Sequence, residues 1–150
     1  LPLHIFRLPG IYGPGRNVLE QIKKGTAKRI IKNDHKFSRI HVEDIAQVLA
    51  ASMKNPNPLS IYNVSDDEPA APAKVIEYAS VLMGKPPPPP IEFNSAKKNM
   101  SPMALSFWND HRTIDNNKIK QDFNLKLKYP NFRDGLSAIY TVNKKYFSTN

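Results

Sequence analysis

The 150-residue sequence contains no cysteine. A disulfide framework and a thiolate nucleophile are therefore excluded, as are the commonest structural zinc sites, which use cysteine ligands. No apolar stretch approaches the ~20 residues that a membrane-spanning helix requires. With 40% hydrophobic residues, the chain still has enough apolar side chains for one globular core. These features predict a soluble protein with no membrane partner, and the lack of cysteine favours a cytoplasmic location.

Acidic residues are scarce relative to basic ones, and the formal net charge is +9. A strong basic excess can indicate nucleic-acid binding. The lysines, however, occur as separated pairs among acidic and apolar residues, with no arginine-rich tract and no interleaved aromatic motif. The sequence therefore predicts no nucleic-acid partner, and a basic nucleic-acid-binding protein is the less favoured alternative.

Strand-like and helix-like hydrophobic patterns alternate over 3–84, which predicts an α/β fold. Strands are expected at 3–8, 29–32, 37–42 and 61–64, and helices at 18–22, 45–53 and 75–83. Asp44 precedes the second of these helices and is expected to be its N-cap. The proline run 86–90 is expected to be a stiff polyproline connector, neither helix nor central strand.

A loop rich in glycine and proline follows the first predicted strand. It lies in the string Arg7-Leu8-Pro9-Gly10-Ile11-Tyr12-Gly13-Pro14-Gly15-Arg16-Asn17. Small residues at the carboxyl end of a parallel strand let the backbone approach a ligand closely, and open α/β sheets bind cofactors at that end. The string therefore indicates a ligand-binding loop. The alternative is that the glycines and prolines only turn the chain.

A second string, 37–46, places Arg39 and His41 on the same face of a predicted strand, because strand side chains alternate. Arginine can bind an anion with its bidentate fork, and histidine can add a single hydrogen bond. The two residues are therefore candidate contacts to an anionic or hydroxylated substrate. A solvated basic face is the alternative interpretation.

Three adjacent acids, Asp66, Asp67 and Glu68, follow the strand predicted at 61–64. No histidine or further acid lies at ligand spacing, and acids before a helix are favoured by its dipole. No metal site is predicted.

These strings, in this order, resemble the C-terminal part of an extended short-chain dehydrogenase/reductase of the NAD(P)-dependent epimerase/dehydratase type. The subgroup most similar is a set of uncharacterised bacterial short-chain oxidoreductases. The resemblance implies that Pro9, Gly10 and Ile11 line the nicotinamide side of a pocket. It also implies that Arg112, in the closing segment of the chain, contacts a substrate phosphate, as an arginine near this place does in the sugar-nucleotide members.

The fold that this resemblance implies is the C-terminal portion of a Rossmann-type parallel sheet plus a small mixed α/β substrate-binding lobe. Residues 1–150 are expected to form a single C-terminal segment. Within it, 1–27 and 44–84 would be the Rossmann-side elements, and 28–43 and 85–150 the substrate-side lobe. The complete parent would transfer hydride at a carbonyl or hydroxyl carbon of a small molecule, with nucleotide sugars as one candidate class.

The departures from the family pattern bear on activity. The 150 residues contain no Gly-x-x-Gly-x-x-Gly loop, which seats the cofactor pyrophosphate, and no Tyr-x-x-x-Lys pair where the family carries it. Tyr140 and Lys144 have the right spacing but fall in the last predicted helix, so the match is interpreted as a coincidence.

No catalytic residue is therefore assigned. NAD or NADP is expected in the complete parent, but neither is expected to bind this chain alone, which would be inactive by itself. Loss of the first strands would also uncover a sheet, which predicts self-association. The alternative is a non-catalytic remnant or regulatory binding module of the same scaffold.

Overall fold

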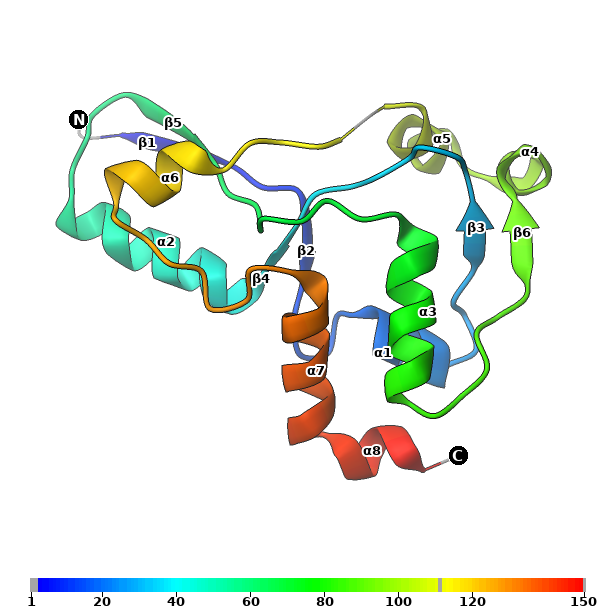
Figure 1. Cartoon of the computed structure of the whole chain (residues 1–150). Helices are drawn as coiled ribbons and strands as arrows, with labels where there is room; N and C mark the ends of the chain where they lie inside the picture. Colours follow the sequence, from blue (N-terminus) through cyan, green and yellow to red (C-terminus); the bar gives the residue numbers. More distant parts are fainter. Residues whose placement is uncertain (1–2, 111, 150) are drawn as a thin grey trace.

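The computed structural model describes residues 3–110 and 112–149 (Figure 1). Within them, the strands form three parallel pairs: β1 with β5, β2 with β4, and β3 with β6. Their bounds are His4–Arg7 (β1), Gly10–Tyr12 (β2), Arg29–Ile31 (β3), Arg39–His41 (β4), Ser60–Asn63 (β5) and Pro90–Glu92 (β6). In Figure 1 the β2–β4 pair lies between the other two pairs.

Helices connect and cover these pairs. Their bounds are Val18–Lys23 (α1), Val42–Lys54 (α2), Pro72–Leu82 (α3), Phe93–Ala96 (α4), Pro102–Asn109 (α5), Asn117–Asp122 (α6), Phe132–Val142 (α7) and Lys144–Ser148 (α8), with a 3-10 turn at Lys97–Asn99 (η1). The mixed α/β architecture of short parallel strands confirms the predicted fold class. No helix in the described ranges is long and apolar enough to cross a membrane.

The first hydrophobic cluster lies where α1, α3, α7 and α8 meet. Its fully buried side chains include Leu19, Leu136 and Phe147, and Tyr12 of β2 reaches into it. Because the apolar face of each helix points to another helix of the same chain, this cluster is closed by the chain itself. It joins α1 and α3 from the predicted Rossmann side to α7 and α8 from the predicted substrate-side lobe, so the proposed division of the chain stays a prediction.

The second cluster lies between the β1–β5 pair and the helices α2 and α6. Tyr62 of β5, Ile40 of β4 and Ile119 of α6 are fully buried in it. The opposite face of β1 and β5 carries Ile5 and Ile61, which are 45% and 41% exposed. Strand side chains alternate, so one face of this pair packs in the core while the other remains uncovered within the described chain.

The prediction that Asp44 caps α2 is wrong. The helix begins at Val42, before Asp44, and its N-cap is His41. The Nδ1 of His41 accepts a hydrogen bond from the Glu43 backbone N–H. Asp44 is fully buried instead and accepts hydrogen bonds from the backbone N–H groups of Lys128 (2.7 Å) and Tyr129 (3.0 Å). Its carboxylate thus ties α2 to the segment before α7, a partnership 84 residues away that local sequence could not indicate.

The proline run also differs from expectation at its last residue. Pro90 begins β6 and pairs in parallel with Arg29 of β3. Proline is tolerated at the first residue of an edge strand because its missing N–H is not needed there. Residues 85–89 have no regular structure, as a connector requires.

Candidate functional site

A cleft of about 460 Å³ opens at the junction of β1, β2 and β4. Its lining residues are Leu8, Pro9, Gly10, Ile11, Arg16, Phe37, Ser38, Arg39, Phe107, Trp108 and Arg112. Five of the six residues selected from the sequence therefore lie around one cavity: Pro9, Gly10, Ile11, Arg39 and Arg112. They come from three segments that are distant along the chain.

The floor of the cleft is set by the pairing of β2 with β4. Gly10 is the register partner of Arg39, and Ile11 that of Ile40. Pro9 lies two residues after Arg7, the last residue of β1, at the end of the strand where a parallel sheet binds ligands. A Cβ at Gly10 would lie 3.7 Å from the Ser38 carbonyl oxygen, so the backbones approach closely without excluding a small side chain.

Arg112 reaches the cleft because its backbone pairs with the start of the β4 segment. Phe37 forms a parallel bridge with Arg112, and the Ser38 N–H donates to the Arg112 carbonyl at 2.9 Å. The Arg112 guanidinium lies over the Phe107 ring, 4.2 Å from its centroid, and donates to Asp110 at 3.2 Å. The side chain is thus held at the rim by a stacking contact and an exposed ion pair.

Arg39 is anchored beneath the cleft. Its Nη1 donates to the carbonyl oxygens of Phe37 and Ala70, both at 3.0 Å. Burial lowers the pKa of Arg39, and the nearby charge of Asp66 partly opposes that effect. Within the described part of the chain, Arg39 forms no ion pair, so a partly buried positive charge lines the cavity with carbonyl partners only.

In the acidic loop after β5, the pKa values of the neighbouring carboxyl groups of Asp66 and Asp67 are shifted in opposite directions. Asp66 is 2% exposed, and burial raises its pKa to about 7. Its Oδ1 accepts from the Glu68 N–H, but its Oδ2 is buried without a hydrogen-bond partner in the described residues. For Asp67, burial acts to raise the pKa, but hydrogen bonds from Asn116 and Lys120 outweigh it, so that pKa lies below its usual value.

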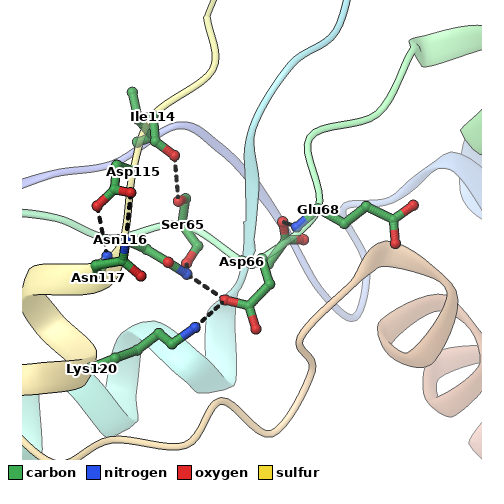
Figure 2. Close-up of polar contacts among 9 residues, drawn as sticks. Ser65, Asp66, Glu68, Ile114, Asp115, Asn116, Asn117 and Lys120 are labelled. Carbon is green, nitrogen blue, oxygen red and sulfur yellow. Dashed lines mark hydrogen bonds and ion pairs between the residues drawn. The ribbon is translucent and has the colours of Figure 1, made fainter.

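Figure 2 shows the side chains of Asn116, the N-cap of α6, and Lys120, within α6, pointing toward the loop that carries Ser65 and Asp66. The Asn116 side chain donates to the Ser65 carbonyl at 2.8 Å as well as to Asp67. These contacts fix the loop against α6. Among the described residues, no group of three or more acids or histidines is arranged to hold a metal ion.

His41 lies apart from the cleft. Its side chain is 1% exposed, and its ring contacts Tyr12 at 5.1 Å and Tyr129 at 4.2 Å between centroids. Burial lowers the pKa of His41, although Glu43 and Asp44 act to raise it, so the neutral imidazole is favoured. Its observed contacts are those of a helix cap and a core ring, and a substrate contact for His41 stays a prediction.

Arg16 lines the cleft although it was not selected from the sequence as a site residue. Its backbone is fixed by two hydrogen bonds with Gly13, Gly13 N–H to the Arg16 carbonyl at 3.0 Å and the reverse at 3.1 Å. Gly15 supplies the left-handed conformation of this turn, at φ +76°. The sequence feature that could have indicated Arg16 is its position directly after a Gly-Pro-Gly turn, because the turn fixes the backbone position of that residue.

A second cavity of about 280 Å³ adjoins the cleft and shares Ile11, Arg16 and Arg39 with it. It extends between α1 and α7, and its remaining walls include the apolar side chains of Val75, Phe132 and Leu136. Arg16 and Arg39 are therefore shared between the walls of the two cavities.

The parallel strands, with a cleft beyond the carboxyl end of β1, define the C-terminal part of a Rossmann-type α/β protein. A solved Silicibacter pomeroyi protein described as functionally unknown is 51% identical, with a TM-score of 0.87 over 96% of this chain and 50% of that one. The Bacillus anthracis dTDP-glucose 4,6-dehydratase in complex with NAD is 20% identical (TM-score 0.69), covering 97% of this chain and 45% of that one. The human epimerase family protein SDR39U1 with NADPH is 14% identical (TM-score 0.75), covering 92% and 48%.

A curated relative, the 3-diazoavenalumate denitrifying reductase of a Streptomyces species, is 25% identical over 145 residues, which is 88% of this chain and 45% of that protein. No protein-family model matches the chain. The chain spans about half the length of the proteins it matches. Its fold is that of the C-terminal part of NAD(P)-dependent epimerase/dehydratase-type short-chain dehydrogenases, which confirms the resemblance carried by the sequence motifs.

Proposed function

We propose that this chain is the substrate-side part of an NAD(P)-dependent oxidoreductase or epimerase-like protein, and that it is inactive by itself. The observation that supports this most is the 460 Å³ cleft, because it gathers the Pro9–Ile11 segment, Arg39 and Arg112 near the carboxyl end of β1. Within the 150 residues there is neither the glycine-rich loop nor the tyrosine–lysine pair that hydride and proton transfer would need. Those parts would come from a dinucleotide-binding half.

The cofactor proposed for the complete parent is NAD or NADP, and none is proposed to bind this chain alone. NAD and NADPH are the cofactors bound in two of the similar structures. Pro9, Gly10 and Ile11 would form one wall of the nicotinamide site, since their backbone lies open to the cleft and Gly10 lets a ring approach. The nicotinamide would supply the hydride, while these residues would position its ring and exclude water.

The substrate proposed is a small molecule that lies between this wall and the arginines. Arg112 and Arg39 would contact its polar groups, and Phe107 and Trp108 would cover its apolar part. The similar proteins include a dTDP-glucose dehydratase and a 3-diazoavenalumate denitrifying reductase, so nucleotide sugars are one candidate class. His41 would support the wall from behind through its contact with Tyr12. A cytoplasmic location is part of the same proposal.

The uncovered face of β1 and β5 is proposed to be where the dinucleotide-binding half packs. Leu3, Ile5 and Ile61 are 52%, 45% and 41% exposed there. An exposed apolar sheet face and a free strand edge favour association. Without the other half, the same face would drive self-association of this chain.

Complementation tests this proposal. The chain would be mixed or co-produced with the half of the Silicibacter pomeroyi protein to which it is not similar. Thermal unfolding would then be followed with NADH and with NADPH. We expect no cofactor-dependent shift for the chain alone and a shift of several degrees for the complemented protein, because ligand binding stabilises the folded state.

The control is the other half alone with the same cofactors. A monomeric, cooperatively unfolding chain that is shifted by NADH or NADPH on its own would contradict the proposal. So would a complemented protein that gives no shift beyond the sum of its halves.

A further inference from the structure

The residues around the two adjoining cavities carry an unusual balance of charge. Three arginines line them, Arg16, Arg39 and Arg112, whereas no aspartate or glutamate does so within the described ranges 3–110 and 112–149. Arg112 is paired with Asp110 at 3.2 Å, an acid that lines neither cavity. For Arg16 and Arg39 no ion pair is found in the described residues. The walls of the cavities therefore carry positive side chains and no acid.

Among the described residues, Arg16 and Arg39 are the charged side chains that line both cavities. Arg16 is exposed, and no hydrogen bond or ion pair of its guanidinium is found in the described part of the chain. The Arg39 Nη1 donates hydrogen bonds to two carbonyl oxygens. The acid whose charge acts most on Arg39 is Asp66, which is buried and has a pKa of about 7. At neutral pH that carboxyl is only partly ionised, so it neutralises Arg39 incompletely.

The walls around this pair are apolar and aromatic. Leu8, Phe37, Phe107 and Trp108 line the larger cavity, and Phe132 and Leu136 line the smaller one. Phe37 and Trp108 are in edge-to-face contact, with ring centroids 5.7 Å apart, so this wall is pre-organised. A planar aromatic group fits such a wall by stacking and by displacing water.

We propose that Arg16 and Arg39 form an anion-binding pair for an aryl carboxylate or aryl phosphate, with the anionic group at the junction of the two cavities and the aryl group against Phe107 and Trp108. This rests on the proposed function only in treating the larger cavity as the substrate pocket. Guanidinium groups bind both kinds of anion through paired N–H donors, so carboxylate and phosphate share the same recognition chemistry. Arg16 is then a binding residue of the site.

The protein carries its own reporter for this site, because Trp108 is its only tryptophan and lines the cleft. Titrations of the whole chain, without cofactor or any second polypeptide, would follow Trp108 fluorescence with four probes: benzoate, phenyl phosphate, benzamide and inorganic phosphate. We expect benzoate and phenyl phosphate to bind. Benzamide and inorganic phosphate should bind at least roughly tenfold more weakly. Added salt should weaken the two aryl anions more than benzamide.

Two variants locate the anion. Arg16→Gln should weaken benzoate and phenyl phosphate binding by roughly tenfold, because it removes a charge-assisted contact. Arg7→Gln is the matched control, since Arg7 is also exposed, carries the same charge and lines neither cavity. Thermal unfolding of both variants, measured beside the parent chain, would verify that they are folded.

Several results would overturn the inference: equal affinity for benzamide and benzoate, equal affinity for inorganic and phenyl phosphate, an Arg16→Gln variant that binds like the parent chain, or no fluorescence change with any probe. Stronger binding of one aryl anion than the other would support it and identify the anion. Because no cofactor is present, a failure here is distinguishable from a failure of the cofactor complementation.

Discussion

The two hydrophobic clusters of this chain differ in how completely the chain covers them. In the cluster among α1, α3, α7 and α8, Leu19, Leu136 and Phe147 are at most 1% exposed. In the cluster of β1, β5, α2 and α6, one sheet face packs Tyr62 in the core at 0% exposed, but the other face exposes Ile5 and Ile61. A domain normally covers both faces of a parallel sheet. The chain therefore closes the helical cluster by itself, whereas we propose that a partner covers the β1–β5 face.

The two regions have different roles around the cleft. The closed helical cluster contributes one wall of the smaller cavity, because its members Tyr12, Phe132 and Leu136 line that cavity together with Arg16 and Arg39. The β1–β5 region carries the loop Pro9–Ile11 at its carboxyl end and the apolar face on its outer side. Its completion by another half would build the cofactor side of the same cleft.

Truncation of a side chain in the closed cluster should have the largest effect on stability. Leu136→Ala removes a fully buried leucine of α7 and should lower the free energy of unfolding by about 2 to 5 kcal/mol. Val142→Ala, in the same helix but 83% exposed, should change it by less than about 0.5 kcal/mol. Urea denaturation of both variants would measure the difference. Equal effects would mean that the helical cluster is not the closed core described.

The next effect should come from Gly135 of α7, which faces the ring of Tyr12. A Cβ built at Gly135 would lie 2.1 Å from the Tyr12 hydroxyl oxygen and 2.8 Å from Cε2 and Cζ. Alanine is ordinarily better than glycine in a helix by ~1 kcal/mol, but the overlap with a buried ring outweighs this gain. Gly135→Ala should therefore destabilise the fold by about 1 to 3 kcal/mol.

The double variant Tyr12→Phe/Gly135→Ala should recover part of that loss, since it removes the nearest overlapping atom. Tyr12→Phe alone should be close to neutral, because the Tyr12 hydroxyl is buried without a hydrogen-bond partner in the described residues. Thermal unfolding of the four proteins would give the coupling energy. A stabilised Gly135→Ala variant would show that β2 and α7 are not in close contact.

The adjacent acids Asp66 and Asp67 should respond to pH in opposite directions. The pKa of Asp66 in the folded protein, about 7, is above its usual value, so the stability it contributes is full below about pH 4 and is lost as pH rises through about 7. Asp66→Asn should therefore raise the free energy of unfolding by about 1 to 3 kcal/mol above pH 7 and leave it unchanged in acid. Denaturation at several pH values would measure this.

Asp67→Asn is the matched control. Its lowered pKa stabilises the fold above the usual aspartate pKa, and the partly exposed ion pair with Lys120 is worth about 1 kcal/mol or less. This variant should be slightly less stable at neutral pH. The same pH profile for both variants would contradict the account of the loop.

The smallest effect on stability, and the clearest on association, should come from the exposed β1–β5 face. Replacing Ile5 and Ile61 by threonine keeps β-branched residues and removes apolar surface that is already 45% and 41% exposed, so the free energy of unfolding should fall by about 1 kcal/mol or less. Self-association should decrease, as sedimentation velocity would show. Val81→Thr, on exposed α3 surface, should leave association unchanged.

The sequence predicted the parts of the fold that depend on local patterns. The strings around Pro9–Ile11 and Arg39 lie in segments that the structure brings to one cleft, because β2 and β4 pair in parallel, and their ligand contacts stay predictions. The roles of Asp44 and His41 could not be predicted in the same way. Asp44 is bound by backbone N–H groups at 128 and 129, and His41 packs between two tyrosines from β2 and the segment before α7.

Arg16 was missed for a related reason. Its position in the chain was clear, but the second cavity that it shares with Arg39 is built partly from α7, more than 100 residues later. Local spacing gives the direction of a strand side chain and does not give the helix that will face it. The charge balance of the cavities emerges only once those distant walls are assembled.

The central claim is that the β1–β5 face binds a dinucleotide-binding half. The most direct test is hydrogen–deuterium exchange of this chain with and without the half of the Silicibacter pomeroyi protein to which it is not similar. The account predicts new protection of backbone amides in β1 and β5, with little change in α3 and α7, which are already closed by the chain itself. Absence of new protection in β1 and β5, or protection confined to α7 and α8, would contradict it.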